Sequence, residues 1–117
     1  ALDPDLVWMR PYRSEAAPGA EVALTISVTN HAAAIATAEL TVEGPVGWTI
    51  EPARCELAIP GGGTTGEARV VVHVPADARP GERVILTADL TLRGRRYGQR
   101  GECIVDVVAA VAADGEG

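Results

Sequence analysis

Apolar and polar residues alternate along several short stretches of this chain, which is the pattern of β-strands with one buried face. The clearest stretch covers residues 21–29, where every second residue is apolar: Val22, Leu24, Ile26 and Val28. Pro-Gly, Gly-Pro or Pro-Gly-Gly-Gly separates such stretches about every ten residues. Short strands at this spacing predict an all-β sandwich.

The same alternation predicts further strands at residues 6–10, 39–43, 48–52, 54–59, 67–74, 83–93 and 102–107. Residues 13–19 are predicted to turn the chain. The alanine-rich residues 31–37 are predicted to be a connection, because so short a segment cannot nucleate a helix alone. Either Arg93-Gly94 or the wider segment 94–98 is predicted to close a hairpin. No connection is both long and helical enough for a parallel crossover, so we expect mostly antiparallel sheets.

Length and composition indicate one thin sandwich. The 117 residues fit a single domain of about seven strands. We expect its core at about residues 6–108 and a flexible tail at residues 112–117. Because Phe is absent and aromatic residues make up only 3% of the chain, the interior must be built from Val, Leu, Ile and Ala.

Net charge and the start of the sequence narrow the expected partners. A formal net charge of −6 argues against non-specific binding to nucleic acid, which depends on a basic surface. No stretch approaches the roughly eighteen apolar residues of a membrane span, and the first residues lack the basic and apolar regions of a signal peptide. We expect a domain excised from the C-terminal part of a larger chain. A secreted or cell-surface location is favoured over a cytoplasmic one.

Cys55 and Cys103 both fall on the predicted inward face of their strands. A disulfide between them is possible if their Cα atoms lie within about 7 Å. Such a bond would imply an oxidising compartment. The alternative is a pair of buried free thiols that act as small hydrophobic residues.

The residues that could carry metal or catalytic chemistry are dispersed along the chain. A zinc site usually has four ligands with two in a close pair, whereas His31, His73 and the two cysteines stand singly, so we expect no metal and no cofactor. The only serines are Ser14 and Ser27, and Ser27 lies on the outer face of its predicted strand. Two carboxylate pairs share predicted strand faces, as solvent faces normally allow: Glu39 with Glu43, and Asp89 with Asp106. We therefore expect no catalytic site.

Arginines are concentrated at and beside the predicted hairpin. The group consists of Arg93, Arg95, Arg96 and Arg100 around Tyr97. A basic tip of this kind can hold phosphate or carboxylate groups, or it can dock on an acidic neighbouring domain. The third interpretation is a solvated hairpin whose arginine stems cover apolar surface.

Three aromatic side chains could form a platform for sugar rings: Trp8, Tyr12 and Trp48. Trp48 follows a Gly-Pro turn and shares a face with Ile50, so burial at the end of the sandwich is the favoured interpretation. Trp8 lies on a terminal strand, where an excised domain exposes surface that another domain would cover.

A set of turn motifs carries a resemblance to a known family. The motifs, in order, are Pro18-Gly19, residues 47–52, Leu57 with Pro60-Gly61, and residues 74–81. In order and spacing they resemble the immunoglobulin-like domain found beside the putative carbohydrate-binding module of α-galactosidases and other bacterial hydrolases. The resemblance covers about residues 18–108. The arginine-rich hairpin and the two cysteines depart from the expected pattern.

The resemblance implies an immunoglobulin-like antiparallel β-sandwich that is an appended, non-catalytic module. Such a module would stabilise or position a neighbouring domain of a larger bacterial hydrolase. Its expected contact surface comprises Trp8, Tyr12 and the arginine hairpin. Two alternatives remain: a carbohydrate-binding module that uses the exposed aromatic residues, and an adhesive or self-assembling sandwich.

Overall fold

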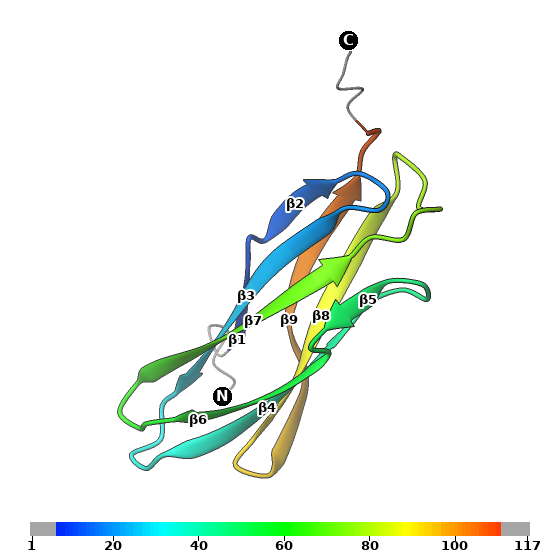
Figure 1. The fold of residues 1–117 in the computed structure, drawn as a ribbon. Helices are drawn as coiled ribbons and strands as arrows, with labels where there is room; N and C mark the ends of the chain where they lie inside the picture. Colours follow the sequence, from blue (N-terminus) through cyan, green and yellow to red (C-terminus); the bar gives the residue numbers. More distant parts are fainter. Residues whose placement is uncertain (1–6, 111–117) are drawn as a thin grey trace.

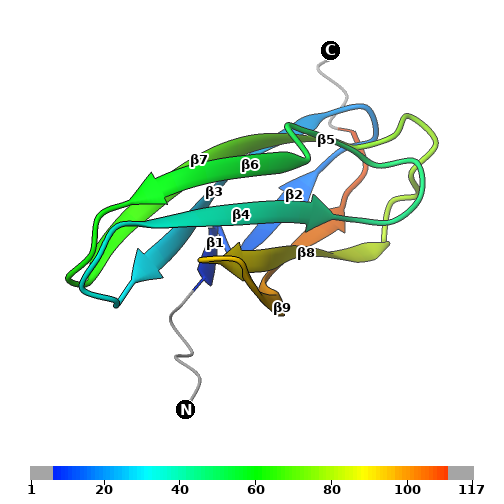
Figure 2. The ribbon, with the colours of Figure 1, turned by 90° about the horizontal axis from the view of Figure 1, so that it is seen from below.

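Two facing β-sheets make up the part of the chain that the computed structural model describes, residues 7–110 (Figure 1). Their nine strands are β1 (Val7–Arg10), β2 (Arg13–Ala16), β3 (Glu21–Asn30), β4 (Ala36–Glu43), β5 (Thr49–Glu51), β6 (Arg54–Ile59), β7 (Thr64–His73), β8 (Arg83–Leu92) and β9 (Arg95–Val107). One sheet has the order β1-β3-β7-β5 and the other has the order β2-β9-β8-β4-β6. The strands run along an elongated sandwich, as the view turned by 90° also shows (Figure 2). The predicted all-β sandwich is confirmed.

The interior lies between the two sheets and is aliphatic. The predicted apolar positions of β3 are buried, as are those of β7 and β8. The largest fully buried aliphatic side chains are Leu24, Ile26, Leu40, Ile59, Leu86 and Leu90. Alternation of apolar and polar residues therefore placed the core correctly, because each strand buries one face against the opposite sheet.

Residues 13–16 correct the sequence prediction of a turn. The chain leaves the four-stranded sheet after Arg10, passes through Pro11 and Tyr12, and joins the five-stranded sheet as β2. There β2 pairs with β9 in parallel. No crossover helix is needed, because nearly the whole domain lies between these two strands in the sequence. The other strand pairs are antiparallel, so the prediction of mostly antiparallel sheets holds.

The alanine-rich connection is shorter than predicted, since Ala36 already begins β4. The side chain of Asn30, at the end of β3, is fully buried beside this connection. Its amide donates a hydrogen bond to the carbonyl oxygen of Ile59, at the end of β6. A single side chain thus ties the connection to a strand of the other sheet.

Two glycine-dependent features shape β9. The two-residue alternative for the hairpin is confirmed, with Arg93 at φ 53° and Gly94 at φ 76°, the positive values that a tight turn between twisted strands needs. Further along, a Cβ atom on Gly101 would lie 2.8 Å from Cγ1 of Val7. Gly101 therefore lets the edge strand β1 pack closely on β9.

The ends of the predicted domain lie partly outside the described residues. This applies to residue 6, the first of the predicted first strand and core, and to the predicted tail at residues 112–117. Within residues 7–110, no helix has the length and apolar character needed to cross a membrane.

Candidate functional site

The edge strand β1 places one aromatic and one basic side chain in solvent. Val7 and Met9 point into the core, so Trp8 and Arg10 point outward. The Trp8 residue is 52% exposed to solvent. Because β1 has a hydrogen-bonded strand on one side only, Trp8 borders two separate hollows.

The first hollow, called here the sheet-face hollow, lies on the outer face of the four-stranded sheet and has a volume of about 350 Å³. Its lining residues come from β1, β3 and β7: Trp8, Arg10, Ser27, Thr29, Thr65 and Glu67. The strand register puts Trp8 opposite Ser27 and Ser27 opposite Glu67. These three residues therefore form one row across the sheet.

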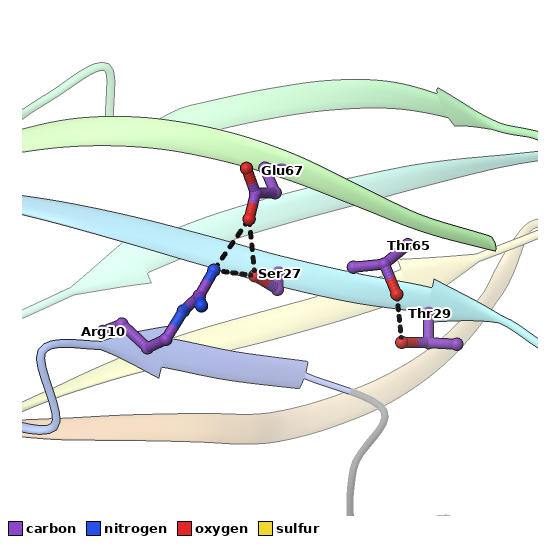
Figure 3. Close-up of polar contacts among 5 residues, drawn as sticks. All are labelled: Arg10, Ser27, Thr29, Thr65 and Glu67. Atoms are coloured by element: carbon purple, nitrogen blue, oxygen red, sulfur yellow. Dashed lines mark hydrogen bonds and ion pairs between the residues drawn. The ribbon is translucent and has the colours of Figure 1, made fainter.

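Hydrogen bonds fix the polar side chains of the sheet-face hollow (Figure 3). Arg10 donates to Oγ of Ser27 at 3.0 Å and to Oε2 of Glu67 at 2.7 Å. The hydroxyl groups of Thr29 and Thr65 lie 3.0 Å apart on the neighbouring strands. Except for Arg10, these polar residues lie on β3 and β7, and in the sequence each is an ordinary residue of its strand with no motif around it.

The second hollow, called here the edge hollow, lies where β1 passes over β9 and also has a volume of about 350 Å³. Its lining residues are Val7, Trp8, Met9, Arg10, Tyr12, Arg100, Gly101 and Glu102. Tyr12 is 56% exposed. The structure thus brings together Trp8, Tyr12 and Arg100, three of the residues that the sequence proposed as an interaction surface.

The remaining residues of the predicted arginine group have different partners. Arg96 makes a two-point ion pair with Asp89 on the five-stranded sheet, with distances of 3.3 and 2.7 Å. The guanidinium of Arg95 lies 5.1 Å from the ring centre of Tyr97, within the range of a cation–π contact. Arg93 forms the turn. Only Arg100 of the four arginines lines the edge hollow.

Arg100 is held in place by a backbone carbonyl three residues earlier in β9. Its Nε donates a hydrogen bond of 2.9 Å to the carbonyl oxygen of Tyr97.

Trp48 is half-buried against the core and lines a separate hollow with residues of the loops near β5 and β8. Of the three aromatic residues, Trp8 and Tyr12 therefore share one hollow, and Trp48 lines another.

Of the two interpretations of the cysteines, the structure has the free thiols, at both Cys55 and Cys103. Cys55 lies on β6 and Cys103 on β9, three strands apart in the same sheet. At about 4.8 Å per strand, the lateral separation alone is about 14 Å, too far for a bond. Burial raises the pKa of both thiols, that of Cys103 to about 11.

The pair of Asp89 and Asp106 does not meet the geometry of acid–base catalysis. Asp106 lies opposite Arg83 on β8, and Asp89 is six residues further along that strand, so about 20 Å separates them. Hydrogen bonds from Arg83 and then from Arg13 lower the pKa of Asp106, and Arg96 lowers that of Asp89. Catalytic carboxylic acids instead need a raised pKa.

His73 is held between two carboxylates on neighbouring strands. Its Nδ1 lies 3.2 Å from Glu21, and its Nε2 lies 3.0 Å from Glu51. In the described part of the chain, no group of three or more His, Cys, Asp or Glu residues is placed to hold a metal ion. Ser27 lies opposite Glu67, six residues along β7 from His73, a separation of about 20 Å that rules out a pair of Ser27 with His73.

The fold and these hollows define an immunoglobulin-like β-sandwich with open surface sites at an edge strand. Residues 16–93 match the model of the NPCBM-associated family, described as the NEW3 domain of alpha-galactosidase. The chain belongs to this family, which is an accessory domain associated with glycoside hydrolases. The family resemblance predicted from the turn motifs is confirmed. No curated protein matches the sequence.

Solved structures show the same fold at low sequence identity. A family 123 glycoside hydrolase from Clostridium perfringens is 12% identical with a TM-score of 0.61, and the match covers 86% of this chain but 23% of that enzyme. SSP-19, an MSP-domain-like protein of Caenorhabditis elegans, is 13% identical with a TM-score of 0.51, covering 86% of this chain and 98% of that one. The seventh ScaB type I cohesin of Pseudobacteroides cellulosolvens is 11% identical with a TM-score of 0.51, covering 95% and 96%.

Proposed function

We propose that this chain is a non-catalytic accessory module of a larger bacterial hydrolase, and that it stabilises and positions a neighbouring domain. Membership of the family supports this proposal, as does the match to less than a quarter of a glycoside hydrolase. The dispersed, ion-paired carboxylates also fit a module without chemistry of its own.

The edge hollow is the proposed site of contact with the neighbouring domain. Trp8 and Tyr12 are each more than half exposed and flank one hollow, where their apolar surface is open to a partner. Arg100 adds a guanidinium that its bond to Tyr97 already orients. Large aromatic residues and arginine are the side chains that dominate binding at protein interfaces. The neighbouring domain is therefore expected to present an apolar patch with a carboxylate at its rim.

Thermal unfolding of the full-length hydrolase that carries this chain tests the proposal. Tyr12→Ala and Arg100→Ala are each expected to lower the unfolding temperature of the neighbouring domain, because they remove contacts that it makes with the module. The turnover number of the enzyme that remains folded is expected to stay unchanged. Val46→Ala is the matched control, since Val46 is a fully exposed apolar residue outside the edge hollow.

The same substitutions in the isolated 117-residue chain separate docking from folding. Because both residues are exposed and Arg100 makes one surface hydrogen bond, each substitution is expected to cost the isolated chain less than about 1 kcal/mol. Equal unfolding temperatures for the neighbouring domain in the native and substituted full-length proteins would contradict the proposed contact.

A further inference from the structure

We infer that the sheet-face hollow is a binding subsite for a neutral carbohydrate, with a sugar ring stacked on Trp8 and its hydroxyl groups bound by Arg10 and Glu67. This inference goes beyond the proposed accessory role. It depends on a different hollow, and only Trp8 and Arg10 border both.

The stacking surface is the exposed face of Trp8. An indole with about half its surface in solvent offers an apolar plane to the C–H groups of a sugar ring, while its N–H group can bond to a polar partner. The strand register places Ser27 one strand away and Glu67 two strands away. At about 4.8 Å per strand, the row from Trp8 to Glu67 spans about 10 Å, enough for a ring to contact both ends.

The polar groups beside Trp8 are already oriented. Arg10 holds Oε2 of Glu67 at 2.7 Å and Oγ of the buried Ser27 at 3.0 Å (Figure 3). A guanidinium supplies only donors and an ionised carboxylate supplies only acceptors. A sugar hydroxyl can both donate and accept, so adjacent hydroxyl groups can bind the two side chains together.

Charge balance favours a neutral ligand over an ion. The hollow contains one cation, Arg10, and one anion, Glu67, which are paired with each other. An incoming carboxylate or phosphate would have to compete with Glu67, and an incoming cation would have to compete with Arg10. A neutral sugar leaves that pair intact and loses no charge complementarity.

The Thr29–Thr65 pair extends the site along the sheet. It lies one row beyond Ser27 and Glu67, and its two hydroxyl groups already share a hydrogen bond of 3.0 Å. Successive rows on one face are about 7 Å apart. A chain of two or more sugar units can therefore follow the strands from Trp8 and Ser27 towards Thr29 and Thr65.

The substitution Glu67→Gln distinguishes a purely structural role of the Arg10–Glu67 pair from a role in binding sugar. Both side chains are about half exposed, and ion pairs of this kind contribute little to stability. If the pair is only structural, the substitution leaves the affinity for glycans unchanged. If the pair binds sugar, the substitution weakens binding while the fold stays as stable as before.

Affinity gel electrophoresis of the 117-residue chain tests the inference, with galactomannan, xylan and mixed-linkage β-glucan as neutral probes and polygalacturonate as the anionic probe. At least one neutral glycan is expected to retard the native chain more strongly than polygalacturonate does. Trp8→Ala and Glu67→Gln are each expected to weaken that binding about tenfold or more. Tyr12→Ala is the matched control, since Tyr12 is an equally exposed aromatic residue that lines only the edge hollow.

Amide chemical shifts of the native chain provide a second measurement that needs no substitution. Titration with the retarding glycan is expected to shift the amides of Ser27, Thr65 and Glu67. Retardation by none of the three neutral glycans would overturn the inference. Retardation that Tyr12→Ala abolishes and Glu67→Gln leaves intact would also overturn it, because the ligand would then occupy the edge hollow. Since Glu67 does not line the edge hollow, failure here leaves the proposed docking contact untouched.

Discussion

Replacing Asn30 with alanine removes a buried polar side chain that holds one end of the sandwich together. The side chain has no exposed surface. Its amide nitrogen donates to the carbonyl oxygens of Ala34 and Ile59, each at 2.9 Å. Its oxygen accepts the backbone N–H of Ala32 at 3.0 Å. Alanine can replace none of these three bonds.

The expected loss follows from those three bonds. A typical hydrogen bond contributes about 1 kcal/mol to stability, so Asn30→Ala is expected to cost about 3 kcal/mol. Domains of this kind have roughly 5–15 kcal/mol of stability in total, so this loss is a large fraction. Asn30→Asp is expected to cost more, because a carboxylate cannot donate to the two carbonyl oxygens and would be buried as an unpaired charge.

Urea denaturation of the native chain and its variants measures the effect. Thr64→Ala is the control, because it removes an exposed hydroxyl that bonds at 2.9 Å to Gly61 in the adjoining turn. The control is expected to lose less than about 1 kcal/mol. The reasoning would be refuted if Asn30→Ala lost no more stability than Thr64→Ala.

Three further predictions concern packing, charge and the thiols. Gly101→Ala is expected to cost about 1–3 kcal/mol in urea denaturation, because its methyl group meets Val7 at 2.8 Å; unchanged stability would contradict this packing. Asp106 has a pKa lowered below 3.8 by two arginines, so its ionised form stabilises the fold above that pH and the contribution disappears as the pH falls through the lowered value. Asp106→Asn is therefore expected to be less stable than the native chain at pH 7, and this difference is expected to shrink in acid. A stability difference that does not change with pH would contradict the stabilising role of the Asp106 carboxylate. Iodoacetamide at pH 8 is expected to modify Cys55 before Cys103, whose thiol has a pKa of about 11; an intact mass two hydrogens short would instead indicate a disulfide.

Local patterning predicted most of the fold because each strand buries alternate residues. The principle failed at β2, where Arg13, Ser14 and Glu15 precede Ala16, the only buried residue of the four. A polar edge strand of this kind has no apolar alternation to detect. Its pairing with β9 joins residues more than ninety positions apart in the sequence, and a local pattern of apolar residues contains no information about such a pairing.

The pairing of strands distant in sequence also explains why the sequence did not reveal the polar residues of the sheet-face hollow. Trp8 and Tyr12 could be singled out as unusual aromatic residues in a chain with few of them. Ser27 and Glu67 could not, since each is an ordinary outward residue until the sheet order places them in one row with Trp8. The sheet order also decides between the two interpretations of the cysteines, a disulfide or two free thiols. Both cysteines were placed on inward faces, but the sheet order separates their strands.

Hydrogen exchange tests the central claim, that this chain docks on a neighbouring domain of a larger hydrolase through its edge hollow. The measurement compares the isolated 117-residue chain with the same segment inside its full-length protein. We predict slower exchange in the full-length protein for backbone amides of β1, Tyr12 and residues 100–102, with β5 and β6 unchanged. Equal exchange rates around the edge hollow in the two proteins would contradict the account.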